Sequence, residues 1–157
     1  MENSSDSLVI FRKNAREAVG VACTEWRGQL RVDVRIYAQA IGEDDLVPTR
    51  KGISIPPDIF PAVLEAVRKL GEVMARERLI ARIPRNHNTE IRIGVNEFRG
   101  QRLIYLRLFL REDSQGEETW KPTQKGVSLR VDLYPRLLDA LEKANAILAA
   151  TECNSRG

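Results

Sequence analysis

The sequence is poor in the residue types that carry most catalytic and metal chemistry. Its 157 residues contain one histidine and two cysteines. His87 lies in a polar run without an adjacent nucleophile or an orienting carboxylate, and Cys23 and Cys153 have no histidine or cysteine nearby. General acid–base catalysis and zinc sites require such neighbours. We therefore expect reduced thiols, no metal, no cofactor and no enzyme activity.

The sequence also lacks long apolar runs and a strong excess of either charge. No stretch is long enough to span a bilayer, and residues 1–7 are polar and acidic rather than basic and then apolar. A net charge of +3 is too small by itself to indicate a nucleic-acid partner. These absences predict a cytoplasmic protein, associated with the nucleoid if its source is prokaryotic.

What the sequence does contain is an internal repeat. WRGQLRVDVRIY at 26–37 returns as FRGQRLIYLRLF at 98–109, and PTRKGISI at 48–55 returns as PTQKGVSL at 122–129. The offsets are 72 and 74 residues (98 − 26 and 122 − 48), which indicates a duplicated domain. We predict a first repeat at 8–77, a second repeat at 78–150, and flexible tails at 1–7 and 151–157. Because units of this size bury little surface alone, we expect them to pack together.

Each repeat has the pattern of several strands followed by one helix. Apolar residues alternate with polar ones over 30–37 and 104–110, which predicts hairpin strands with one buried face. Apolar residues at helical spacing follow Asp58 and Asp132, which we expect to be N-caps. Gly71 and Asn145 predict equivalent helix ends or kinks, and residues 72–80 predict a second helical piece.

The predicted fold class follows from these elements. It is α+β, with two tandem units, each a four-stranded antiparallel curved sheet followed by one C-terminal helix. The two units are expected to pack as an intramolecular pseudo-dimer. A helix covers only one face of a sheet, so the other face is left for solvent or a partner.

That exposed sheet face is the candidate binding surface. Trp26 and Phe98 precede equivalent Arg-Gly turns, so each repeat holds an aromatic ring at a hairpin tip with cations beside it. Stacking of an unpaired base on such a ring contributes roughly 1–3 kcal/mol and tolerates any base, and the cations neutralise phosphates. The predicted nucleic-acid-binding residues are Trp26, Arg27, Arg31, Arg35, Tyr37, Arg50, Lys51, Gly52, Phe98, Arg99, Arg107, Phe109, Trp120, Lys121, Lys125 and Gly126.

Other interpretations stay open. In one, the two rings pack between the repeats and the arginines are simply solvated. In another, the chain is a protein-interaction module, because Leu103, Tyr105 and Phe109 make the outer face of the second repeat apolar, as protein contact surfaces often are. In a third, the ligand is single-stranded RNA rather than DNA.

The run from Trp26 to Tyr37, the block at 48–55 and the helix after it resemble the transcriptional positive-cofactor-four coactivator family. The resemblance implies a strand-rich fold with a C-terminal helix and binding of single-stranded DNA without strong sequence preference. It implies the transcription machinery as a further partner. Family members are usually homodimers, so the duplication implies a monomer with an internal two-fold axis, with further dimerisation left open.

The resemblance also assigns roles and shows departures. Ala38 and Leu110 stand where the family often has a tryptophan, and Arg50 is replaced by Gln124 in the second repeat. We therefore expect the two repeats to bind unequally. The family's eukaryotic Ser/Lys-rich tail is missing, which favours a simpler prokaryotic DNA-binding protein. By this resemblance, the tip aromatic falls on Trp26 and Phe98, and the turn cation falls on Arg27 and Arg99. The strand arginine falls on Arg35 and Arg107. The last-strand cations fall on Arg50 and Lys51 in the first repeat and on Lys121 and Lys125 in the second.

Overall fold

The computed structural model describes residues 8–114 and 116–156, and the tail expected at 1–7 lies outside them. The first repeat comprises β1 (Val9–Arg12), β2 (Glu17–Trp26), β3 (Gln29–Gln39), β4 (Leu46–Ile55) and α1 (Phe60–Val73). The second comprises β5 (Arg78–Pro84), β6 (Thr89–Phe98), β7 (Gln101–Ser114), β8 (Glu117–Arg130), a 3-10 turn (Val131–Leu133) and α2 (Tyr134–Arg156).

The strands form two antiparallel sheets in simple sequential order. The first sheet runs β1-β2-β3-β4 and the second β5-β6-β7-β8. The alternation in the sequence is realised in both, since Val32, Val34 and Ile36 are buried while the residues between them are partly exposed. The predicted fold class is therefore confirmed.

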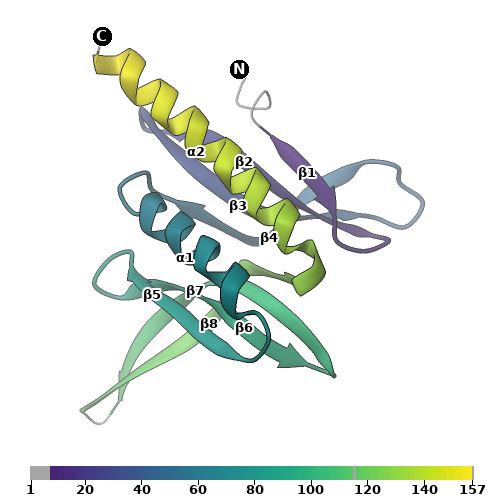
Figure 1. Ribbon diagram of the computed structural model, residues 1–157, viewed down its shortest axis with the longest axis vertical. Coiled ribbons are helices and arrows are strands. Elements are labelled where there is room, and N and C mark those ends of the chain that lie inside the picture. Colours follow the sequence, from purple (N-terminus) through teal and green to yellow (C-terminus); the bar gives the residue numbers. More distant parts are fainter. Residues whose placement is uncertain (1–7, 115, 157) are drawn as a thin grey trace.

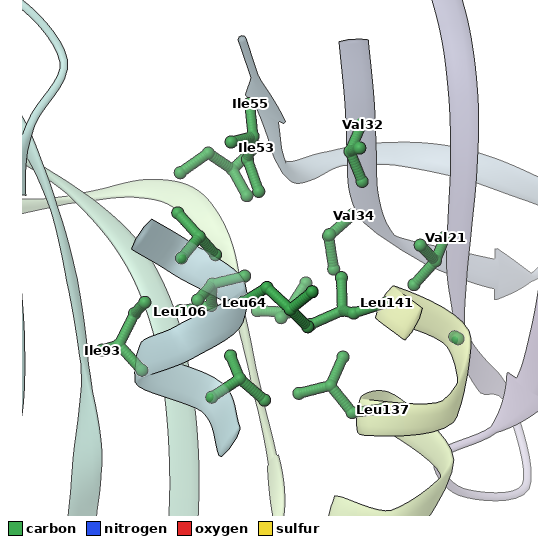
Figure 2. Packing of buried hydrophobic residues seen from close by; sticks show 14 of the residues in the cluster. Val21, Val32, Val34, Ile53, Ile55, Leu64, Ile93, Leu106, Leu137 and Leu141 are labelled. Atoms are coloured by element: carbon green, nitrogen blue, oxygen red, sulfur yellow. The ribbon is translucent and has the colours of Figure 1, made fainter. Parts of the chain in front are cut away.

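The two helices exchange sheets. α1, which ends the first repeat, packs against β5 and β6 of the second, and α2 packs against β2 of the first (Figure 1). Figure 2 shows Leu64 of α1 on the side of Ile93 and Leu106, and Leu141 of α2 on the side of Val34. The buried residues of both repeats form one continuous hydrophobic cluster. Neither repeat completes its own core, which gives the pseudo-dimer a physical basis.

The helix starts differ from the prediction. Asp58 does not cap α1, because the helix begins at Phe60 after Ile59, which makes no side-chain capping bond. In the second repeat a 3-10 turn precedes α2, and Asp132 pairs instead with Arg130 at 3.2 Å. Pro61 does lie in the first turn, where its missing N–H costs no hydrogen bond.

The helix ends differ as well. α1 passes through Gly71 to Val73, and α2 passes through Asn145 to Arg156, into the segment assigned to a C-terminal tail. No second helical piece follows α1, because β5 begins at Arg78. Gly71 has another role: a Cβ there would lie 2.8 Å from the hydroxyl of Tyr134, which donates to the carbonyl of Val67 at 2.7 Å. No helix in the described ranges is both long and apolar enough to cross a membrane.

The edge strands β4 and β8 lie beside each other without joining the two sheets into one. The helices cover the inner faces, which leaves the two outer faces adjoining along these edges.

Candidate nucleic-acid interface

The two hairpin tips have the same strained turn. Trp26 pairs with Gln29 and Phe98 with Gln101, so only an Arg-Gly pair forms each turn. Both turn residues have positive φ, with 51° and 77° in the first repeat and 52° and 79° in the second. This is the geometry of a type I′ turn, in which asparagine or glycine is the usual first residue. An arginine there is conformationally unfavourable, which suggests a use for its charge.

The tip rings are exposed, as predicted, and carry cations on their faces. Trp26 is 53% exposed and Phe98 59%. The guanidinium of Arg27 lies 4.5 Å from the centroid of the Trp26 ring and that of Arg31 5.5 Å, and Arg99 lies 5.1 Å from the Phe98 ring. Because more than half of each residue is exposed, neither ring is enclosed between the repeats. Each tip presents an apolar ring within a positive field.

The strand arginine of the first repeat is neutralised. Arg35 donates from Nε and Nη2 to the two carboxylate oxygens of Asp33 at 3.0 and 2.8 Å, and from Nη1 to the carbonyl of Thr49 at 2.8 Å. The hydrogen bond with Asp33 raises the pKa of Arg35. Asp33 and Arg35 lie two residues apart on β3, so this ion pair is formed within one strand and does not cross to a neighbouring strand.

The strand arginine of the second repeat keeps its charge. Arg107 donates to the carbonyl of Thr123 at 2.9 Å and to the hydroxyl of Ser128 at 3.1 Å. Within the described ranges no carboxylate pairs with it, because Tyr105 replaces Asp33. Burial lowers the pKa of Arg107. The equivalent arginines thus present different net charge to a ligand.

The repeated Pro-Thr-x-Lys-Gly block forms a bulge opposite each strand arginine. The pairing of β3 with β4 shifts register between Arg35 and Tyr37. There the Thr49 hydroxyl donates to the carbonyl of Ile36 at 2.8 Å and accepts from the N–H of Lys51 at 3.2 Å. Thr123 makes the equivalent bonds in the second repeat, at 2.8 and 3.1 Å. These threonines were not among the predicted site residues, although their recurrence at 49 and 123 was a visible signal.

The two repeated glycines allow close approach of neighbouring groups. A Cβ at Gly52 would lie 2.6 Å from Cζ of Arg35, and one at Gly126 would lie 2.4 Å from the carbonyl oxygen of Leu106. Gly52 lets the arginine side chain lie flat on the sheet, whereas Gly126 lets two strands approach. The glycines therefore shape the outer face and need not touch a ligand.

The last-strand cations divide into open and paired ones. Arg50, Lys51 and Lys125 are exposed, and among the described residues none of them forms an ion pair. Lys121 pairs with Glu112 at 2.9 Å. Two of the three open cations lie on β4 and the third lies on β8.

An ion network that the sequence analysis missed covers the second sheet. Glu90 is buried, and it accepts from Arg82 at 2.7 Å and from Arg92 at 2.6 Å. Burial opposes ionisation of Glu90, but the hydrogen bonds from the two arginines outweigh it and hold its pKa below the ordinary range. The equivalent positions in the first repeat are Ala18 and Gly20, at an offset of 72. The alternation of Glu90 and Arg92 on the outer face was the available signal.

The two arginines of this network also lie over the rings of Phe109 and Trp120 on the second sheet. Arg92 lies 4.3 Å from the centroid of Phe109 and 6.0 Å from that of Trp120, and Arg82 lies 5.6 Å from Trp120. The indole N–H of Trp120 donates to Glu118 at 2.9 Å. Among the described residues of the first sheet, guanidinium groups lie over Trp26 but not over Tyr37, whose ring instead lies over Gly20. The aromatic rings on the outer face of the second sheet are therefore already in contact with charged side chains of the same sheet.

Fold and surface together define a class of protein: a duplicated antiparallel-sheet protein that displays aromatic and cationic hairpin tips on exposed sheet faces. The chain belongs to the transcriptional coactivator p15 (PC4) family, whose model matches residues 13–66 and 86–140, one segment in each repeat. The resemblance expected from the sequence, in two tandem copies, is thus confirmed.

Among solved structures, the chain is similar to a PC4 homolog from Burkholderia pseudomallei in an orthorhombic and a tetragonal crystal form. The identities are 28% and 29%, over 45% and 44% of this chain and 92% and 97% of those chains, with a TM-score of 0.38 in each case. No curated protein sequence matches the chain.

Proposed function

We propose that the protein binds single-stranded DNA without sequence preference, in transcription regulation or DNA maintenance. The observation that carries this proposal is the recurrence of an exposed ring beside a strained arginine at both hairpin tips. Trp26 is 53% exposed and Phe98 59%, so both rings are accessible to a ligand. Splayed bases stack on such rings, whereas the bases of a duplex are already stacked.

The first sheet is the stronger candidate surface. Its ring carries two guanidinium groups, from Arg27 and Arg31, and β4 adds the open cations Arg50 and Lys51. On the second sheet, Arg82 and Arg92 are ion-paired with the buried carboxylate of Glu90. Among the described residues, four predicted site cations of the first sheet and three of the second have no carboxylate partner, which is in line with unequal binding by the two repeats: Arg27, Arg31, Arg50 and Lys51 against Arg99, Arg107 and Lys125.

Titration of a labelled oligothymidine with the full chain tests the proposal. We expect binding that weakens as salt rises, because neutralised phosphates release counterions. Trp26→Ala should cost more affinity than Phe98→Ala, since only the Trp26 ring carries a second cation. Absence of binding at low salt would contradict the proposal, and competition with an RNA oligonucleotide of the same length decides between DNA and RNA.

A protein contact on the second sheet is the second candidate. Tyr105, Arg107 and Phe109 line a cavity of about 520 Å³ there, together with Leu79 of β5. Leu79 is 45% exposed, so an apolar rim adjoins the cavity. If Leu79→Ser leaves oligonucleotide binding intact but abolishes an association detected by light scattering, that surface holds protein rather than nucleic acid.

A further inference from the structure

A cavity of about 570 Å³ opens at the junction of the two repeats. Trp26, Arg31 and Ser54 line it from the outer face of the first sheet, and Arg85 and Asn86 line it from the turn between β5 and β6. The site is therefore composite, and neither repeat contains it alone. Trp26 and Arg31 were predicted to lie on a binding face, whereas Arg85 was not among the predicted site residues.

Two arginines converge in this cavity without a neutralising carboxylate. Arg31 donates to neutral partners only, from Nε to the hydroxyl of Ser54 at 3.0 Å and from Nη1 to the amide oxygen of Gln29 at 3.5 Å. Within residues 8–114 and 116–156, neither Arg31 nor Arg85 forms an ion pair. Glu25 also lines the cavity, but it is exposed and makes no ion pair with either arginine.

The electrostatic environment of Arg85 is unfavourable as it stands. Burial, and then the positive charge of Arg31, lower the pKa of Arg85. Two like charges held together from different repeats repel each other, and a bound anion would offset that repulsion. Guanidinium groups bind phosphate oxygens through paired N–H donors, which makes a phosphate the matching anion.

We propose that this cavity binds one phosphodiester group of a single strand, between Arg31 and Arg85, while the adjacent base stacks on Trp26. This site rests on the proposed function and defines how the nucleic-acid strand passes from one repeat to the other. The strand leaves the first sheet at the β2–β3 tip and continues onto the β5–β6 turn of the second repeat. Arg31 thus serves both the ring and the phosphate.

The pseudo-symmetric position lacks this site. At the offset of 72, Leu103 replaces Arg31 and Lys13 replaces Arg85. Lys13 is already paired with Glu17 at 3.7 Å. The phosphate site between the repeats therefore exists at the Trp26 tip and not at the Phe98 tip. A nucleic-acid strand has one route between the repeats of this chain, whereas a symmetric dimer would offer two equivalent routes.

Full-length variants with equal charge change test the site. Oligothymidine binding is measured by fluorescence anisotropy at several salt concentrations for wild type, Arg85→Ala and the control Lys13→Ala. We expect Arg85→Ala to weaken binding about tenfold, the size expected for one charge-assisted hydrogen bond. The slope of log K against log salt should fall by about 0.7, the value for one phosphate of a single strand. Lys13→Ala should match wild type, and equal titrations of the two variants would overturn the inference.

Arg31→Leu, which installs the residue of the second repeat, should reproduce the loss. The double variant Arg31→Leu/Arg85→Ala should be little worse than Arg31→Leu alone, because both substitutions remove the same phosphate contact. Strict additivity of the two losses would mean two separate contacts and would overturn the shared site. Both residues lie outside the buried core, and circular dichroism confirms that the variants fold.

A second measurement does not depend on oligonucleotide binding. Titration of nitrogen-15-labelled protein with inorganic phosphate should shift the Nε–H signals of Arg31 and Arg85, and thymidine 5′-monophosphate should also shift the indole N–H of Trp26. If wild type binds no oligonucleotide and these signals stay still, both the proposed function and this site fall. If inorganic phosphate shifts the arginine signals, thymidine 5′-monophosphate does not shift the Trp26 signal, and Arg85→Ala leaves oligonucleotide binding unchanged, the cavity binds free anions. The proposed path of the strand is then wrong.

Discussion

Arg35 and Arg107 occupy equivalent positions in the two sheets, and only Arg35 is held by a carboxylate. Both donate to the carbonyl of the bulge threonine, at 2.8 Å to Thr49 and 2.9 Å to Thr123. This shared bond makes the arginines part of the sheet's construction. The added bond to Asp33 cancels the charge of Arg35, so one arginine has kept its structural role while its contribution to a ligand is reduced.

Asp33→Asn should therefore strengthen binding of oligothymidine. The substitution keeps the shape of the side chain and frees the Arg35 charge, so we expect a gain of about threefold to tenfold at low salt. The free energy of unfolding should fall by at most about 1 kcal/mol, because the pair is partly exposed. Asp139→Asn on α2 changes net charge equally and is the control. A gain of the same size in the control would show that overall charge, rather than Arg35, is responsible.

Arg27→Asn should separate stability from binding. Asparagine adopts the left-handed conformation of the turn more readily than arginine, so the free energy of unfolding should stay constant or rise by up to about 1 kcal/mol. Oligothymidine affinity should fall, because the cation 4.5 Å from the Trp26 ring is lost. Arg27→Lys keeps the charge and should retain most of the binding. Denaturant unfolding and anisotropy on the same samples check both statements, and loss of stability in Arg27→Asn would contradict the turn assignment.

Glu90→Gln should destabilise the second sheet at neutral pH and change its response to acid. The buried carboxylate accepts from Arg82 and Arg92, so its neutralisation should cost about 1–3 kcal/mol of unfolding free energy. Because the folded pKa of Glu90 is lowered, its stabilisation is complete above the ordinary glutamate pKa. That stabilisation is lost as pH falls through the lowered folded value.

The difference in stability between wild type and Glu90→Gln should thus be constant near neutral pH and shrink in acid. Urea unfolding at a series of pH values measures it. A difference that grows on acidification has the wrong sign and would refute the assigned role of Glu90.

Gly71→Ala should destabilise the protein, although it lies within a helix. In an ordinary helix interior the change stabilises by about 1 kcal/mol. Here the new Cβ would lie 2.8 Å from the hydroxyl of Tyr134, on the helix of the other repeat. In a Tyr134→Leu background the same change should become neutral or stabilising. Thermal unfolding of the four proteins completes the cycle, and stabilisation by Gly71→Ala in the wild-type background would contradict the contact.

The two repeats should not fold separately. A fragment of residues 1–77 would lack α2, which covers β2, and would leave the buried stripe of α1 without β5 and β6. We expect each fragment alone to unfold without cooperativity or to aggregate, and an equimolar mixture to recover the circular dichroism of the full chain. A stable monomeric first repeat would show that the exchange of helices is not required.

Several features followed from the sequence alone because they depend on near neighbours. Alternation over 30–37 sets which face of β3 is buried, since successive side chains point to opposite sides of a strand. A turn of two residues, Arg-Gly, closes each hairpin and so places Trp26 and Phe98 at the tips. The repeated blocks indicated both the duplication and the resemblance to the family, and the fold class was predicted from them.

Other features were decided by contacts between residues far apart in the chain. Local capping preference favoured Asp58, but packing of Phe60 in the shared core sets where α1 begins. Gly71 was expected at a helix end, yet α1 continues through it, and the absence of a side chain there leaves the space that Tyr134 of the other repeat fills. The exchange of helices brings Arg85 beside Arg31, and no local pattern contains that approach. The sequence determined which side chains face outward, and only tertiary packing decided which charges meet, because charge pairing depends on distances that the fold creates.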